Sequence, residues 1–269
     1  MEDFVHLCQP DARKSCGACC GLYNYSANSR ASLETRLQRR TALFRKMVRG
    51  AEDLEAFSTT IKEMEDQNRI YEVIYCCEFI GFLDANEKKV GCLLHPMQNG
   101  GVDMRDISFY GKELCDGHFC PSYHYISREE KLALINIIND WHLFGLCITD
   151  IDLVKEYFRL ISEGAYKMPA SHIFKEEPFK EISLRFFEFK LRWPFRSPAD
   201  NRFGKYAFDG HHYMIPYIDY EAIGCERSRF DKILLSLSSV FKNAGELRDA
   251  ERIIQEQIDQ FVSAYHQRY

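Results

Sequence analysis

Four short segments of this sequence place cysteines at spacings that suit metal ligation. The first reads Cys16-Gly17-Ala18-Cys19-Cys20, in which a Cys-x-x-Cys spacing encloses a glycine. This spacing forms a tight turn that aims two thiolates at one ion. Because the spacing is specific, it predicts that Cys16 and Cys19 are metal ligands.

Two pairs of adjacent cysteines, Cys19 with Cys20 and Cys76 with Cys77, bear on how many ions are held. Adjacent side chains diverge along most backbones, so both members of a pair do not easily reach one centre. If their segment is a strand, Cys76 and Cys77 face opposite sides and only one reaches the site. We predict that Cys77 is the ligand and that one member of the first pair can serve a second metal.

The remaining segments combine cysteine with histidine. Cys92 stands three positions before His95, and Cys115 and Cys120 enclose His118. Each histidine is either a metal ligand or a hydrogen-bonded loop residue, and the sequence leaves both interpretations open.

Most of the cysteines are concentrated in the first half of the chain, where nine of the eleven precede Pro121. The alternative to ligation is a set of reduced core cysteines, since free cysteine is often buried. We adopt that alternative for Cys76, Cys147 and Cys225, which have apolar or helical neighbours. The predicted metal ligands are Cys8, Cys16, Cys19, Cys20, Cys77, Cys92, Cys115 and Cys120.

The thiol set can serve zinc or iron. Zn²⁺ takes four nitrogen or sulfur ligands in a tetrahedral array, so the predicted thiolates could close one site or two. Zinc is the preferred cofactor, because it would add folding free energy to a loop-rich segment. A [4Fe–4S] cluster, also held by thiolates, is the alternative cofactor and would favour an enzyme.

The region from Cys8 to Pro121 resembles the YkgJ-like cysteine-cluster proteins, a family proposed to chelate zinc or iron. The motifs that carry the resemblance are Lys14-Ser15-Cys16-Gly17-Ala18-Cys19-Cys20, Cys77-Glu78-Phe79-Ile80, Val90-Gly91-Cys92-Leu93-Leu94-His95 and Cys115. Two features depart from the family pattern: Arg13 stands where its first cysteine is expected, and its Arg-Pro-x-x-Cys element is absent as written. The family includes flagellin lysine N-methylases, so the resemblance implies redox or methyl-transfer chemistry as an alternative activity.

Composition narrows the remaining function classes. The chain has 269 residues and a net charge of −5, which gives no support to generic nucleic-acid binding. We interpret the basic stretch from Arg36 to Arg49 as a solvated helix face rather than a phosphate-binding one. The opening residues carry no secretory signal and no apolar run is long enough to span a membrane, so we expect a cytoplasmic protein without disulfides. A metal ion is the expected partner, and the sequence identifies no protein partner or substrate.

The pattern of apolar residues and breakers predicts a mainly α (α+β) fold. Residues 1–125 form a cysteine-rich, irregular metal-binding region with a small strand element in 71–83, and residues 126–269 form a mainly helical region packed with the first as one globular unit. Ser32 is expected to cap a first helix, which Gly50 stops. A second helix carries apolar residues from Leu54 to Met64. A Ser127/Glu130 capping box begins a third helix, which ends near Gly145. A further helix is expected after Thr149 or Asp150, ending at Gly164, and another after Pro178. The chain is expected to end in a helical hairpin over residues 230–265 with a break at Gly245.

Overall fold

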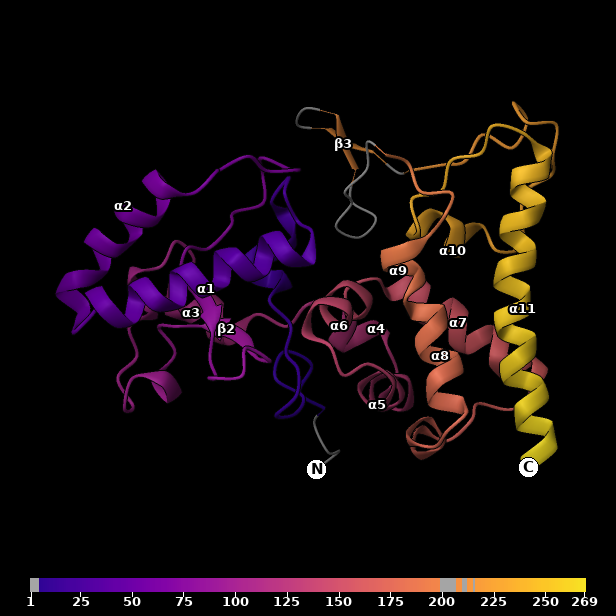
Figure 1. Cartoon of the computed structure of the whole chain (residues 1–269), viewed down its shortest axis with the longest axis horizontal. Helices are drawn as coiled ribbons and strands as arrows, with labels where there is room; N and C mark the ends of the chain where they lie inside the picture. The colour runs from indigo at the N-terminus through magenta and orange to yellow at the C-terminus, as the bar shows by residue number, and fades with distance from the viewer. Residues whose placement is uncertain (1–4, 199–206, 210–211, 215) are drawn as a thin grey trace. The chain divides into compact units, whose positions relative to one another are not determined.

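The computed structural model describes residues 5–198, 207–209, 212–214 and 216–269, and in this part the chain is mainly helical (Figure 1). The chain divides into two compact units. We call His6–Cys120 with Asp140–Gly145 the cysteine-rich unit, and Pro121–Asn139 with Leu146–Tyr269 the helical unit. Among the described residues, no helix combines the length and the apolar character that crossing a membrane requires.

Two helices frame the cysteine-rich unit. Helix α1 (Arg30–Met47) begins after Ser29, whose side chain accepts a hydrogen bond from the Ser32 amide, so the N-cap is Ser29 and not the predicted Ser32. Helix α2 (Leu54–Met64) spans the predicted apolar residues, from Leu54 to Met64. The two helices pack through a buried cluster that includes Phe44, Phe57 and Ile61, with Phe44 and Phe57 in edge-to-face contact at 5.3 Å between ring centroids.

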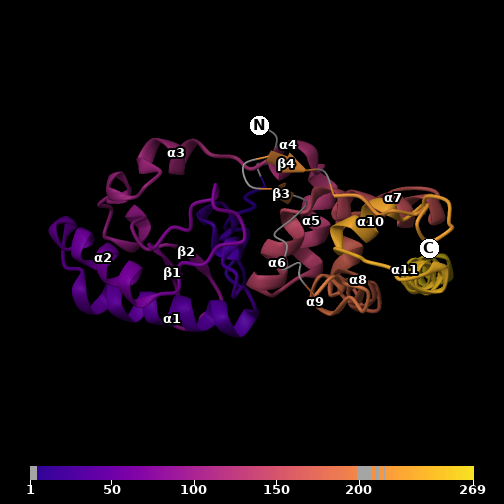
Figure 2. The same cartoon turned by 90° about the horizontal axis from the view of Figure 1, so that it is seen from above.

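A short antiparallel hairpin forms the strand element of this unit (Figure 2). Strand β1 (Ile80–Phe82) pairs with β2 (Val90–Cys92), with Ile80 opposite Cys92. The Phe82 amide donates to the Thr41 hydroxyl at 2.8 Å, which joins β1 to α1. The strand expected within residues 71–83 is therefore limited to Ile80–Phe82, and its partner strand, Val90–Cys92, lies outside those residues.

The rest of the unit is mostly loop and short helix. Helix α3 (Gly111–Gly117) carries Cys115 and has no buried residue. The first residues of α6 (Trp141–Ile148) also belong to this unit, where the Tyr23 hydroxyl donates to the Trp141 carbonyl at 3.2 Å. Gly145, the predicted helix end, lies inside α6 instead, and a Cβ there would meet the Tyr23 hydroxyl oxygen at 2.0 Å.

The helical unit packs several helices around aromatic side chains. Its helices are α4 (Ser122–Tyr125), α5 (Arg128–Ile137), α7 (Ile151–Gly164), α8 (Phe179–Phe187), α9 (Phe189–Arg192), α10 (Asp231–Ser236) and α11 (Ala244–Arg268). Tyr157 of α7 contacts Phe186 of α8 at 4.5 Å between ring centroids, and Phe261 of α11 stacks on Phe174 at 5.4 Å. The apolar faces of α7, α8 and α11 therefore share one core.

Several local signals of this half are confirmed. The Ser127/Glu130 capping box starts α5, the Asp150 side chain caps α7 by accepting from the Leu153 amide, and α7 ends at Gly164. Pro178 precedes α8 as expected. Strands β3 (Ala207–Asp209) and β4 (His212–Met214) pair in antiparallel orientation.

Two expectations for this half are corrected. The helix predicted to run from the capping box to Gly145 ends at Ile137, because Ile138 is extended at ψ 123° and α6 starts separately at Trp141. The predicted terminal hairpin is also wrong: α10 ends at Ser236 and packs mainly on α7, while α11 packs mainly on α8 and α7. Gly245 is not a break but lies in the first turn of α11, which Asn243 caps.

Candidate metal centre

All eight predicted ligands belong to the cysteine-rich unit, and within the described part of the chain no cysteine forms a disulfide. Their neighbours divide the eight into two groups of thiols. The first contains Cys8, Cys16, Cys19 and Cys120, and the second contains Cys20, Cys77, Cys92 and Cys115.

The first group joins the start of the unit to its end. The Cys16 amide donates to the Cys8 carbonyl at 2.9 Å, so these two residues are backbone neighbours. The Cys19 thiol shares a hydrogen bond with Cys120, which is the main cause that raises the Cys19 pKa. Burial, with the charges of Cys8 and Cys120, raises the pKa of Cys16. Without a metal, Cys16 and Cys19 are therefore held in the neutral form.

The second group forms around the β hairpin. The Cys77 amide donates to the Cys20 carbonyl at 2.9 Å, and Cys92 ends the strand opposite Ile80. Cys20, Cys77 and Cys92 also pack in the apolar cluster between α1 and α2. Burial, followed by the charges of Cys77, Cys92, Cys115 and finally Cys16, raises the pKa of Cys20, so the two groups adjoin through Cys16 and Cys20.

Gly21 makes the approach of Cys20 to Cys77 feasible. Its φ of 73° is left-handed, and a Cβ at this position would meet the Tyr75 carbonyl oxygen at 2.1 Å. Only glycine accepts both that conformation and that proximity without strain. The turn after Cys20 can therefore lie directly against the segment that leads to Cys77.

Three of the thiols accept hydrogen bonds from amides that follow them in the chain. The Ala18 amide donates to Cys16, the Phe79 amide to Cys77 and the Leu94 amide to Cys92, and each contact lowers the pKa of its thiol. Burial is the larger effect, so the pKa of Cys77 is still raised to about 12 and that of Cys92 to about 11. Such N–H donors favour a thiolate over a thiol.

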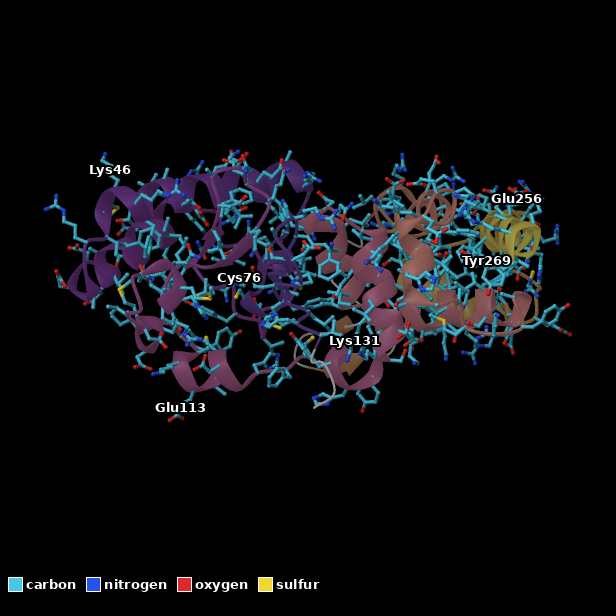
Figure 3. All side chains as sticks on the ribbon, turned by 90° about the horizontal axis from the view of Figure 1, so that it is seen from below. Lys46, Cys76, Glu113, Lys131, Glu256 and Tyr269 are labelled. Carbon is cyan, nitrogen blue, oxygen red and sulfur yellow. The ribbon has the colours of Figure 1, made fainter. Side chains whose placement is uncertain are left out.

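The three cysteines assigned to packing have other partners. Cys76 is buried inside the unit (Figure 3) and accepts a hydrogen bond from the Asn24 amide group at 3.7 Å. The Cys147 thiol donates to the Phe187 carbonyl at 3.9 Å, and the Cys225 thiol to the Ile223 carbonyl at 3.7 Å. Each of these three thiols therefore contacts a polar group that is not another thiol.

The two candidate histidines have different surroundings. The His95 Nδ1 accepts a hydrogen bond from the Met97 amide at 3.2 Å and caps a short 3-10 helix, Pro96–Gln98. This contact supports the loop interpretation of His95. His118 is exposed and follows α3.

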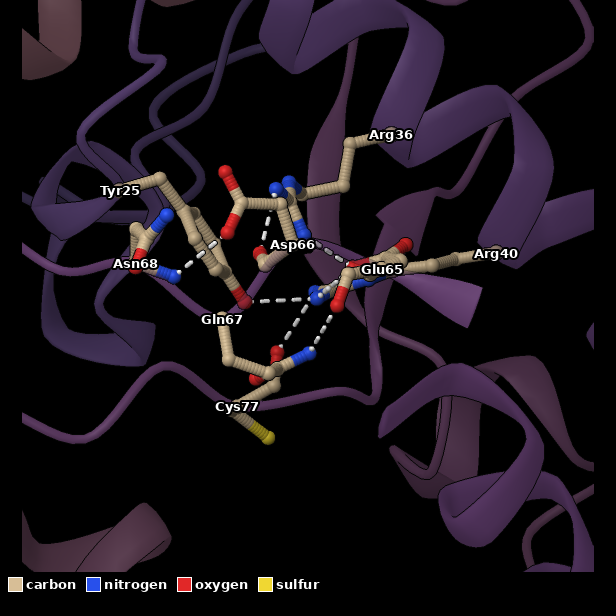
Figure 4. A network of polar contacts seen from close by, with 8 residues as sticks. All are labelled: Tyr25, Arg36, Arg40, Glu65, Asp66, Gln67, Asn68 and Cys77. Atoms are coloured by element: carbon tan, nitrogen blue, oxygen red, sulfur yellow. Dashed lines mark hydrogen bonds and ion pairs between the residues drawn. The ribbon is translucent and has the colours of Figure 1, made fainter. Parts of the chain in front are cut away.

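A buried ion network behind Cys77 was not predicted from the sequence (Figure 4). Arg40, only 1% exposed, donates to the Cys77 carbonyl at 2.8 Å and to the Tyr25 hydroxyl at 2.7 Å. Glu65 accepts from Arg40 at 2.7 Å and also pairs with Arg36. The interpretation of the basic stretch as a solvated face is therefore wrong for Arg36 and Arg40.

The position of Arg40 in the apolar pattern of its helix indicates that its side chain is buried. Leu33, Leu37, Arg40 and Phe44 recur at intervals of four, three and four, so Arg40 lies on the apolar face of α1. A charged residue on that face requires a buried counter-ion, which Glu65 supplies from the segment after α2.

The thiols are grouped but not yet arranged as ligands around an ion. Over the residues that the structure describes, no three Cys, His, Asp or Glu side chains meet as a metal site. No family model matches the sequence, and neither a curated protein nor a solved structure shows significant similarity to it.

Proposed function

We propose that this chain is a metal-binding protein whose cysteine-rich unit holds metal ions through two sets of four thiolates. One set is Cys8, Cys16, Cys19 and Cys120, and the other is Cys20, Cys77, Cys92 and Cys115. The observation that carries the proposal is that the thiols within each set come from distant parts of the sequence and yet interact with one another.

The chemistry of the donors supports this proposal. Four thiolates satisfy the coordination of one Zn²⁺, and two sets would satisfy two ions. The amide donors to Cys16, Cys77 and Cys92 supply the hydrogen bonds that stabilise charged sulfur. Arg40 places a buried positive charge beside Cys77 and lowers its pKa, which opposes the negative charge of a four-thiolate site.

Zinc is the cofactor that we propose first, since it needs only these ligands and adds folding free energy to a loop-rich unit. Sulfurs that are grouped but not converged would be drawn together by the ion, so binding would be coupled to local ordering. That coupling suits a unit whose strands have only three residues each.

An iron–sulfur-dependent enzyme is the second candidate. Each set also has the four thiolates that a [4Fe–4S] cluster requires, and amide donors to sulfur are one of the features that tune cluster potentials. The resemblance to a family that includes flagellin lysine N-methylases would then extend to redox or methyl-transfer chemistry. Thiolate ligation is common to both candidates, and the bound metal distinguishes them.

Metal and acid-labile sulfide analysis of protein purified without oxygen tests the proposal. Colourless protein with zinc and no sulfide supports the first candidate, and brown protein with iron and sulfide, bleached by air, supports the second. The Cys147→Ala and Cys225→Ala variants serve as controls that should keep the wild-type metal content. Protein without metal, which also fails to take up Zn²⁺ or to form a reconstituted cluster, would refute both.

A further inference from the structure

A cavity of about 240 Å³ lies in the cysteine-rich unit. Its walls come from α1, α2, the segment that follows α2 and the segment from Tyr75 to Glu78. None of the eight predicted thiolate ligands lines it. The volume is below the range of about 300–1,000 Å³ typical of drug-sized ligands, so the cavity suits a small molecule.

Positive charge predominates on the cavity wall. Arg40, Lys62 and Arg69 contribute three cations against the single carboxylate of Glu78. Two of the cations have counter-ions, because Arg40 pairs with Glu65 at 2.7 Å and Lys62 with Glu78 at 3.2 Å. Across the described part of the chain, Arg69 has no carboxylate within ion-pair distance.

Arg69 is half-buried, and its guanidinium lies against an aromatic ring. Its carbon lies 5.4 Å from the centroid of the Tyr75 ring, which is itself stacked on Phe109 at 4.2 Å. The backbone of Arg69 forms an antiparallel bridge with Tyr25. The ring contact leaves the planar fork of N–H donors at the edge of the guanidinium, and that fork matches the paired oxygens of a carboxylate or phosphate.

We propose that this cavity binds a small molecule carrying a carboxylate or phosphate group, with the oxyanion paired to Arg69. The side chain of Gln67, which donates to the Glu65 carbonyl at 3.0 Å, and the ammonium of Lys62 are the neighbouring polar groups on the wall. The site uses none of the predicted ligands, although its wall residue Arg40 also donates to the Cys77 carbonyl.

Isothermal titration at constant ionic strength tests this site, with inorganic phosphate in one arm and succinate in the other. We expect saturable binding of at least one probe to the full chain, and a loss of about tenfold or more in affinity in Arg69→Gln. Arg39→Gln is the matched control, because it removes the same charge from an exposed position of α1 outside the cavity. The arm that binds identifies the oxyanion.

Arg69→Lys keeps the charge but loses the fork, so its affinity should fall by a smaller factor than that of Arg69→Gln. This second variant decides the matter if Arg69→Gln proves unfolded by circular dichroism. The proposal is overturned if neither probe binds the wild type, if both Arg69 variants bind like the wild type, or if Arg39→Gln weakens binding equally.

Discussion

Cys76 and Cys77 are adjacent cysteines with different surroundings. Cys76 contacts Asn24 and lines the cavity, whereas Cys77 lies beside Cys20 and accepts a hydrogen bond from the Phe79 amide. The divergence of neighbouring side chains separates the two thiols. Cys76 and Cys77 therefore differ in role although both are cysteines, because the direction of each side chain from the backbone decides which other thiols it can reach.

Replacing Cys19 with serine should remove one set of ligands and leave the other. We expect the bound metal to fall to about half of the wild-type stoichiometry, because a hydroxyl is a poor substitute for a thiolate at zinc or an iron–sulfur cluster. Elemental analysis of the purified variants measures this. Cys147→Ala and Cys225→Ala should retain the full amount, and unchanged metal in Cys19→Ser would contradict the assignment of that residue.

Metal binding should release protons and strengthen as pH rises. Burial raises the pKa of Cys92 to about 11 and that of Cys77 to about 12, so the metal-free thiols are protonated near neutral pH. Each proton displaced by the ion multiplies the apparent affinity by about ten per pH unit. Competition titrations with a chelator at several pH values should show this slope, and an affinity that does not change with pH would exclude ligation by these thiols.

The raised pKa values also set the direction in which the stability of the metal-free unit changes with pH. A thiol whose pKa is raised on folding favours the folded state while both states are protonated. This contribution is present below the ordinary thiol pKa of 9.0 and is lost as pH rises through the folded value of about 11 for Cys92.

Element boundaries were predictable where a local chemical signal marks them. The capping box at Ser127 and the carboxylate cap at Asp150 depend only on nearby backbone groups, so the sequence identifies them. The break after Ile137 was not predictable in this way. The apolar spacing continues through Ile138 to Trp141, and only the conformation of the intervening residues separates α5 from α6.

The candidate site was predictable only in part, for the same reason. The Cys-x-x-Cys spacing indicates a knuckle at Cys16 and Cys19. The neighbours of Cys20 depend on a long-range approach, in which Gly21 lies against Tyr75. Arg40 was misinterpreted because the surrounding charges suggested a solvated face, while its buried partner Glu65 is 25 positions away in sequence.

The network around Arg40 should contribute to the stability of the elements that carry Cys77. Arg40→Met removes a buried cation that contacts Glu65, Tyr25 and the Cys77 carbonyl. Of the described residues, Arg36 alone then remains as an ion-pair partner of Glu65. We expect the free energy of unfolding to fall by about 3 kcal/mol, as for other broken buried pairs. Chemical denaturation measures this loss.

Arg39→Met is the control for that experiment. Arg39 is the next residue of α1 and is exposed. Its replacement should change the free energy of unfolding by less than about 0.5 kcal/mol. Equal losses in the two variants would show that the Arg40 network contributes no more than a surface charge.

Across the whole molecule, the two units differ in what can stabilise them. The helical unit has a shared aromatic core in which α7, α8 and α11 meet, and Phe261 of α11 is fully buried. The cysteine-rich unit has its apolar cluster between α1 and α2, but its thiols reside largely in loops and short elements. Under the proposed function, metal would connect these distant segments directly.

Chelation should therefore loosen the cysteine-rich unit first. Binding free energy at a site absent from the unfolded chain appears as folding free energy, so its removal should act where the thiolates are. With a strong chelator, we expect amides between Asp11 and Pro121 to lose hydrogen-exchange protection before those of α11, whose apolar face is buried independently of metal. Exchange measured by mass spectrometry with and without chelator tests this order. Equal loss in both units would instead indicate one cooperative core, because local loosening cannot spread to α11 unless the two units unfold together.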